Sequence, residues 1–503
     1  MAGNADSQPL RVERIVFRGN RALPTAALRA VAAPYLGRDL TADDIEALCS
    51  ALTHRYTDHG YITSSVVVDP DASYHDGMLS FLVIEGRIKE IRVQGANGLR
   101  PSYVVERLHV REDDALNTDV LRSRLQRLSE DPMIAHVTSN LEPVPESADA
   151  ILDVNAQRAK PYSLSAALNN YRPPSIGEKS YDIGGQLRNL TGFGDVIDSS
   201  LSGPLEFSGG IGYTLNWQIP LNRADSAVSL SAARVNTVYP AQAQSTPEIS
   251  STIERQEFKL SQAIWGSLRQ QVNVGVSIAN EEESTPGYGL SSLSPGLTPG
   301  STHSLTASLI PQYSYRSAQQ YLNLKFTALH ADLRGYPPGP ATYPLPDQNY
   351  FVWVGQLHDL WEFPHAPFEF ESRAILQRTH SQISDLHALE IGGINSVRGY
   401  QEDEVLVSNA TNLNFDFRWL ALPAAASLRP GVTLGTFFDW ASGHDVDQPN
   451  DTFSSYGLTF RLKWAHVQAD LAYGLRLIHP AFADAQHGSW QDHGIHVQVV
   501  TSL

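Results

Sequence analysis

The stretch Val272-Asn273-Val274-Gly275-Val276-Ser277-Ile278 alternates apolar residues with polar or small ones. A period of two indicates a β-strand with one apolar face and one polar face. Similar segments of about ten residues fill positions 162–503, with clusters of Gly, Pro, Asn and Ser between them. The sequence predicts sixteen strands here, with fourteen as an alternative count, the first over 162–170 and the last over 493–502, and it shows no convincing helix in this region.

A soluble β-sandwich would show the same alternation, so three other observations favour a membrane barrel. Positions 162–503 give about 21 residues for each of sixteen strands with its connection, a normal figure for a transmembrane barrel. All eight tryptophans lie in this region, many near predicted strand ends, as an interfacial aromatic girdle requires. Connections differ in length: long ones span 240–250, 281–300 and 335–347, and very short ones span 266–267 and 316–317. The predicted fold class is an all-β transmembrane barrel of about 16 antiparallel strands.

Composition argues against several classes of protein. Among the 503 residues, 54 acidic side chains outnumber 37 basic ones, and the formal net charge of −17 argues against a nucleic-acid partner. No run of about 18 apolar residues is present, so no transmembrane helix is predicted. The single cysteine, Cys49, excludes a disulfide framework and a cysteine-rich metal site. No hydrolase, phosphate-loop or zinc motif is present, so we predict no enzyme, no cofactor and no metal site.

Residues 10–157 contain the same small α/β unit twice, after a tail over 1–9. Each copy reads as strand, helix, helix, strand, strand; the first copy spans 10–86 and the second spans 87–157. The sheet edges of such a unit can accept an added strand from a peptide, so a binding module is favoured over a mere scaffold. No polar cluster in this region has the spacing of a catalytic or metal site.

Two motifs lie in the first copy and at its end. Gly60-Tyr61-Ile62-Thr63-Ser64 follows the second predicted helix, and Val83-Ile84-Glu85-Gly86-Arg87-Ile88 stands where the two copies join. Together they resemble the first POTRA domain of two-partner secretion transporters, the outer-membrane exporters of haemolysins, filamentous adhesins and contact-dependent toxins. The resemblance implies two periplasmic α+β POTRA domains ahead of the barrel. Their motif residues would be Gly60, Tyr61, Glu85, Gly86 and Arg87.

A third motif, Ile391-Gly392-Gly393-Ile394-Asn395-Ser396-Val397-Arg398-Gly399-Tyr400, lies between the eleventh and twelfth predicted strands. It resembles the signature of the outer-membrane assembly-factor superfamily, to which two-partner transporters belong. The resemblance implies an extracellular loop that folds back into the barrel lumen over about 390–405, with Val397, Arg398, Gly399 and Tyr400 at its tip. A permanently charged guanidinium in a partly desolvated lumen needs a counter-ion, so we expect a carboxylate on the inner wall.

The expected partner of Arg398 is Asp439, in Gly435-Thr436-Phe437-Phe438-Asp439-Trp440, which resembles the family's matching wall motif. A period of two places Gly435, Phe437 and Asp439 on one face of the strand and Trp440 on the other. If Trp440 faces lipid, then Asp439 faces the lumen.

The resemblance implies a pore in the Gram-negative outer membrane, with its POTRA domains in the periplasm. It would recognise a secreted exoprotein by that protein's N-terminal secretion domain and export it unfolded without ATP, as a monomer in outer-membrane lipid. Many family members begin with a plug helix; about ten residues precede the first predicted strand here, so we expect such a helix to be absent or to have been removed, and the Arg398 loop alone to close the lumen. The alternatives are a barrel-assembly insertase of the same superfamily and a general diffusion porin. Two POTRA domains rather than several weigh against the first, and periplasmic domains weigh against the second.

Overall fold

The computed structural model describes residues 9–72, 74–96, 98–108, 110–111, 113–205, 210–221, 226–239, 249–267, 269–285, 300–334, 347–423, 430–478 and 488–503. These residues form two compact units. The first unit comprises the chain up to Pro161 together with Gly192–Gly194, and the second comprises Tyr162–Thr191 and Asp195–Leu503. The tail over 1–8 and the interiors of the three predicted long connections, 240–248, 286–299 and 335–346, lie outside the described residues.

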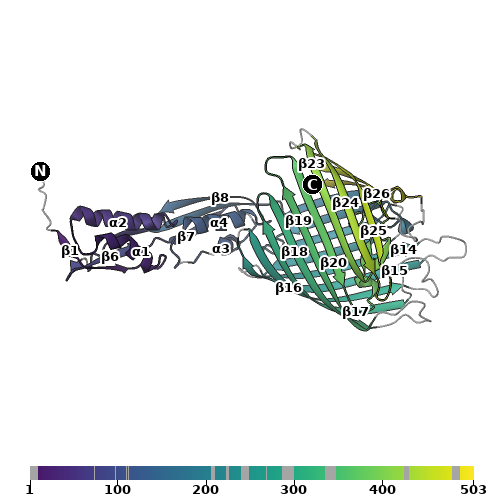
Figure 1. The fold of residues 1–503 in the computed structure, drawn as a ribbon, viewed down its shortest axis with the longest axis horizontal. Helices are drawn as coiled ribbons and strands as arrows, with labels where there is room; N and C mark the ends of the chain where they lie inside the picture. The colour runs from purple at the N-terminus through teal and green to yellow at the C-terminus, as the bar shows by residue number, and fades with distance from the viewer. Residues whose placement is uncertain are drawn as a thin grey trace. The chain divides into compact units, whose positions relative to one another are not determined.

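An α/β module forms the first part of the first unit (Figure 1). Its main sheet has the order β2-β6-β4, with β2 parallel and β4 antiparallel to β6. Leu48, Leu52 and Tyr56 of α2 are fully buried in the core of this module, and a capping box of Thr41 with Asp44 begins that helix. The elements are β1 (Leu10–Val12), β2 (Arg14–Arg18), α1 (Thr25–Ala32), η1 (Ala33–Tyr35), β3 (Arg38–Leu40), α2 (Ala42–Thr57), β4 (Ser65–Val68), β5 (Tyr74–His75) and β6 (Met78–Ile84).

A second module follows with the predicted order of strand, helix, helix, strand, strand. Its sheet has the order β7-β9-β8, with β7 parallel and β8 antiparallel to β9. Asn117 caps α4 by accepting hydrogen bonds from the N–H groups of Asp119 and Val120. The elements are β7 (Ile88–Gln94), α3 (Pro101–Leu108), α4 (Thr118–Ser129), β8 (Ile134–Pro143) and β9 (Ala150–Arg158). None of the described helices is both long and apolar enough to cross a membrane.

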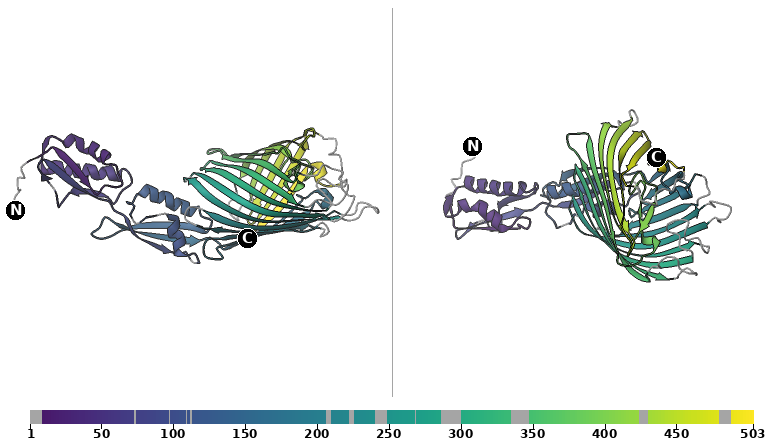
Figure 2. Two further views of the ribbon diagram at one scale, coloured as in Figure 1. Left: turned by 90° about the horizontal axis from the view of Figure 1, so that it is seen from below. Right: turned by 45° about the vertical axis from the view of Figure 1, so that its right-hand side comes forward.

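The second unit is a closed barrel of sixteen strands, each antiparallel to its neighbours, so the predicted fold class is confirmed (Figure 2). The first strand, β10, pairs with the last, β27, and closes the cylinder. The strands are β10 (Tyr162–Asn169), β11 (Ser180–Arg188), β12 (Val196–Pro204), β13 (Gly212–Pro220), β14 (Ala227–Tyr239), β15 (Ile249–Gly266), β16 (Gln270–Thr285), β17 (Gly300–Arg316), β18 (Gln320–Arg334), β19 (Asn349–Glu362), β20 (Phe368–Arg378), β23 (Asn409–Leu422), β24 (Gly431–His444), β25 (Asp451–Trp464), β26 (Val467–Arg476) and β27 (Ile495–Ser502).

Four neighbouring strands run further than the alternation of the sequence predicts. The seventh strand is predicted over 268–280 but β16 continues to Thr285, and β15, β17 and β18 lengthen at the same end of the barrel. Glu281, Glu282 and Glu283 are polar on both faces, so they carry no period of two. Their backbone groups nevertheless continue the pairing, because ladder hydrogen bonds do not depend on an apolar face.

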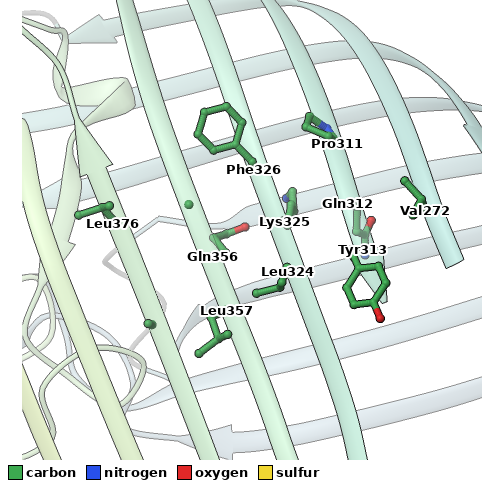
Figure 3. Close-up of a pocket in the computed structure, with 12 residues that line it drawn as sticks. Val272, Pro311, Gln312, Tyr313, Leu324, Lys325, Phe326, Gln356, Leu357 and Leu376 are labelled. Carbon is green, nitrogen blue, oxygen red and sulfur yellow. The ribbon is translucent and has the colours of Figure 1, made fainter. Parts of the chain in front are cut away.

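The pairing of β17 with β18 has an irregular place on the outer surface of the barrel. The register there skips Ile310 and Pro311, because proline has no N–H to donate to the ladder. Figure 3 shows Pro311, Phe326 and Leu376 on three strands around this place. They border a mainly apolar hollow of about 480 Å³ over Gly355, where a side chain would have only Leu376 as a neighbour, at 4.0 Å.

Candidate functional site: the lumen loop and its wall

The connection between β20 and β23, residues 379–408, is the longest in the barrel. It contains a short helical turn, η3 (Asp385–His387), and a hairpin of β21 (Leu389–Ile391) with β22 (Val405–Val407). The hairpin brings together the two ends of the loop tip, 392–404. We call residues 379–408 the lumen loop. Its hairpin was not predicted, because strands of three residues are too short to show a period.

The guanidinium of Arg398 lies between two wall carboxylates. Its Nε and Nη2 donate to the oxygens of Asp439 at 2.8 and 2.7 Å, and its Nη1 and Nη2 donate to those of Asp416 at 2.7 and 3.2 Å. Its guanidinium carbon lies 3.7 Å from the centre of the Phe437 ring. Arg398 is 4% exposed, Asp416 2% and Asp439 0%. These paired, charge-assisted bonds hold the loop tip in one position, because an unpaired charge at this depth would be strongly disfavoured.

The wall residues of this network face the inside of the barrel. Phe415 and Phe417 on β23 and Phe438 on β24 are among the exposed apolar side chains of the outer surface. Because side chains alternate along a strand, the buried residues between them point inward. Arg398 therefore reaches the wall from the lumen. Gly435, which was also predicted for this wall, packs against the neighbouring strand β25.

Two residues of β23, Asp416 and Asn414, complete the network and were not predicted. The side-chain amide of Asn414 donates to Asp439 at 2.8 Å and to the backbone carbonyl of Ser396 in the loop tip. The two residues are polar at a spacing of two on a strand whose other face is aromatic. That pattern indicates a polar inner face, but nothing in it says that a loop will contact this face.

The neighbours of Arg398 fasten the tip to two further strands. Val397 is fully buried in a small apolar cluster beneath the tip. The hydroxyl of Tyr400 donates to the carbonyl of Ser454 on β25 at 3.1 Å. The carbonyl of Gly399 accepts a hydrogen bond from Nε of Arg476 on β26 at 2.6 Å. All four residues predicted for the loop tip thus contact the barrel or the cluster below it.

The backbone of the loop tip lies directly against the backbone of β26. Gly399 has a φ of +97°, and a Cβ on Gly474 of β26 would lie 2.7 Å from both N and Cα of Gly399. No side chain fits at this distance, so the contact requires glycine at both positions.

The motif residues of the N-terminal unit form a joint between its two modules. Oε1 of Glu85 accepts hydrogen bonds from the N–H groups of Arg21 and Ala22, both at 2.8 Å, and from the hydroxyl of Tyr56 at 3.0 Å. The ring of Tyr61 packs edge-on against that of Tyr56, with centroids 5.8 Å apart. Glu85 and Tyr61 therefore stabilise the first module at the end where the second begins.

The remaining motif residues contact the second module directly. A Cβ on Gly86 would lie 2.0 Å from a backbone oxygen of the second module, so only glycine allows this approach. The N–H of Arg87 donates to Asp149 at 3.0 Å, and the carbonyl of Gly60 accepts from the N–H of Thr118 at 2.9 Å. The five predicted POTRA residues are thus gathered at one place.

Comparison with known families decides the identity. Residues 10–86 match the POTRA domain of ShlB type, and residues 149–444 match the haemolysin secretion/activation proteins ShlB/FhaC/HecB. The chain belongs to this family. Its barrel lies in the outer membrane, and its ShlB-type POTRA region lies in the periplasm.

Individual relatives of the ShlB/FhaC/HecB family are distant in sequence. The heme/hemopexin transporter protein HuxB of Haemophilus influenzae (strain 86-028NP) is 23% identical over 198 residues, which are 38% of this chain and 34% of HuxB. The outer membrane transporter CdiB of Escherichia coli is 24% identical over 517 residues, covering 95% of this chain and 80% of CdiB. The solved structure of CdiB from Escherichia coli gives a TM-score of 0.73 at 17% identity, covering 100% of this chain and 92% of that one, so the two share a fold.

The joint makes the stability of the N-terminal unit depend on pH. Burial, and then the carboxylate of Glu85, raise the pKa of Tyr56 above the ordinary tyrosine value. As the pH rises, the unfolded chain therefore loses this proton before the folded chain does. The stabilisation is complete below pH of about 10 and falls above it by at most about 1.4 kcal/mol per pH unit.

We expect Tyr56→Phe to flatten the loss of stability between pH of about 9 and 12, measured by thermal unfolding of the whole protein. The same change at the exposed Tyr74 is the control, and an unaltered pH profile for Tyr56→Phe would contradict the prediction.

Proposed function

We propose that this protein is a two-partner secretion transporter, a pore that passes a partner exoprotein unfolded from the periplasm to the exterior without ATP and without catalysis. Family membership supports this, as does the similarity to HuxB and CdiB, which are transporters. The observation that carries the proposal is the buried Arg398 network. It holds the tip of the lumen loop inside the barrel through two carboxylates, an arrangement suited to closing and opening a passage.

We propose that residues 10–86 and 87–157 act as two POTRA domains that capture the N-terminal secretion domain of the exoprotein. Within the described part of the chain, β4 and β8 each pair with one strand only. The unpaired N–H and C=O groups of β8, a strand of 10 residues, offer a template for an incoming strand. The pore would work as a monomer surrounded by outer-membrane lipid, and its net charge of −17 leaves no role for nucleic acid.

Deletion of residues 10–86 tests the capture step. We expect a co-expressed exoprotein with an N-terminal secretion domain to disappear from the culture medium, because the first capture module is gone. The exoprotein is measured by immunoblot of the medium, and insertion of the barrel by the mobility of unheated and heated samples on gels. Full export by the deletion variant would refute the capture role. If the deletion removes both export and the inserted barrel, the point variant Gly86→Ala takes its place as the test, because it strains only the joint between the two modules.

A further inference from the structure

A second buried contact fastens the lumen loop to the wall, on strands other than those that hold Arg398. We call residues 379–388, which lead from β20 into the hairpin, the stem of the loop. His387, in this stem, lies between Glu281 of β16 and Tyr350 of β19. Its Nε2 is 2.8 Å from a carboxylate oxygen of Glu281, and its Nδ1 is 2.6 Å from the hydroxyl of Tyr350. The side chains of His387 and Glu281 are 6 and 3% exposed, and Tyr350 is 1% exposed.

The hydrogen bonds of this contact have one consistent direction. The backbone N–H of Ser384 donates to the hydroxyl oxygen of Tyr350, so that the O–H of Tyr350 is left to donate to Nδ1 of His387. Nε2–H of His387 then donates to Glu281, whose other oxygen accepts from Arg255 on β15. A neutral imidazole satisfies every member of this chain, because it has one donor and one acceptor nitrogen.

Apolar packing and one amide complete the contact. Ile383, in the same stem, is buried against an inward-facing cluster that includes Leu333 of β18 and Val352 of β19. The side-chain amide of Gln377 on β20 donates to the carbonyl of His387 at 2.9 Å and to that of Ser408 at 3.1 Å. Gln377 therefore ties the incoming arm of the loop to the outgoing arm.

We propose that His387 is a positioning residue of the gate. It anchors the stem of the lumen loop to β16 and β19 independently of the Arg398 anchor on β23 and β24. The tip can then leave the wall while the stem stays attached, so the loop swings about its stem instead of leaving the lumen. This inference rests on the proposed function, in which the loop closes the pore.

Site-specific labelling separates the two anchors. Ser384 in the stem and Ser396 in the tip are each 6% exposed, so Ser384→Cys and Ser396→Cys make matched reporters in a Cys49→Ser background. The probe is a charged maleimide added to the purified full-length protein in detergent, and its rate of reaction is followed by mass spectrometry. We expect Arg398→Ala to raise labelling at position 396 about tenfold or more, and His387→Ala to do so at position 384. Each variant should leave the other position within about twofold of its original rate, because the two openings are independent.

A milder variant guards against misfolding of His387→Ala. Tyr350→Phe removes only the hydroxyl and should raise labelling at position 384 in the same direction. Tyr456→Phe, the identical change at an exposed site on the outer face of β25, should have no effect. The inference fails if Arg398→Ala exposes both reporters equally, or if both stem variants leave position 384 protected. If labelling follows the expected pattern but the Arg398→Ala variant exports normally, then the His387 anchor is supported and the proposed role of the loop in closing the pore is refuted.

Discussion

Replacing Arg398 with alanine is expected to remove most export of the exoprotein while the barrel remains inserted. The change leaves Asp439 buried without its counter-charge and leaves Asp416 with the more distant Arg373, at 3.7 Å. Removing one partner of a buried ion pair costs about 3–5 kcal/mol. The tip then loses its fixed place on the wall and obstructs the lumen in many positions. Exoprotein in the medium and the heat-modifiable mobility of the barrel are the two measurements.

Two further variants make this result specific. Arg461→Ala breaks another Arg–Asp pair inside the same barrel, with Asp470, but those side chains are 46 and 20% exposed. An exposed pair contributes at most about 1 kcal/mol, so export should be nearly normal. Arg398→Lys should restore little export, because an ammonium cannot make two forked contacts with carboxylates. Export at the original level by Arg398→Ala would contradict the role of the loop.

Gly474→Ala is expected to displace the loop tip without changing a residue of the loop or any charge. The new Cβ would lie 2.7 Å from N and Cα of Gly399, and β26 is held by its neighbours on both sides. The tip must therefore move, at a cost of about 1–3 kcal/mol for the overpacking alone. Labelling at a cysteine in place of Ser396 should rise, and export should fall as it does for Arg398→Ala.

Gly355→Ala is the matched control, because it adds the same methyl group to a strand glycine whose new Cβ would have only Leu376 within 4 Å, at 4.0 Å. It should leave labelling and export unchanged. The double variant Gly474→Ala with Arg398→Ala should be little worse than either single variant, since both break one contact. A tip that stays protected in Gly474→Ala would refute the argument from close approach.

The sixteen strands could be predicted because a period of two is a local property of the chain. The Arg398–Asp439 pairing could be predicted only through the family motifs, with the period deciding that Asp439 points inward. Asp416 and the stem anchor could not be predicted in this way. His387 and Glu281 are 106 positions apart, and they meet only because closure of the barrel sets the distance between β16 and the loop. The local periodicity of the sequence cannot show which residues meet across the closed barrel.

Sixteen is an even number, and this has a consequence for how the protein enters its membrane. Antiparallel strands in even number return the chain to its starting side, so Tyr162 and Ser502 emerge on the same side of the bilayer. Every outward segment must then cross the lipid as the bend of a hairpin, with no free end. The longest bend is the lumen loop, which carries Arg398. The lumen loop must therefore carry the charge of Arg398 across the lipid as a bend folded back on itself, and the finished lumen then pairs that charge with the wall carboxylates of Asp416 and Asp439.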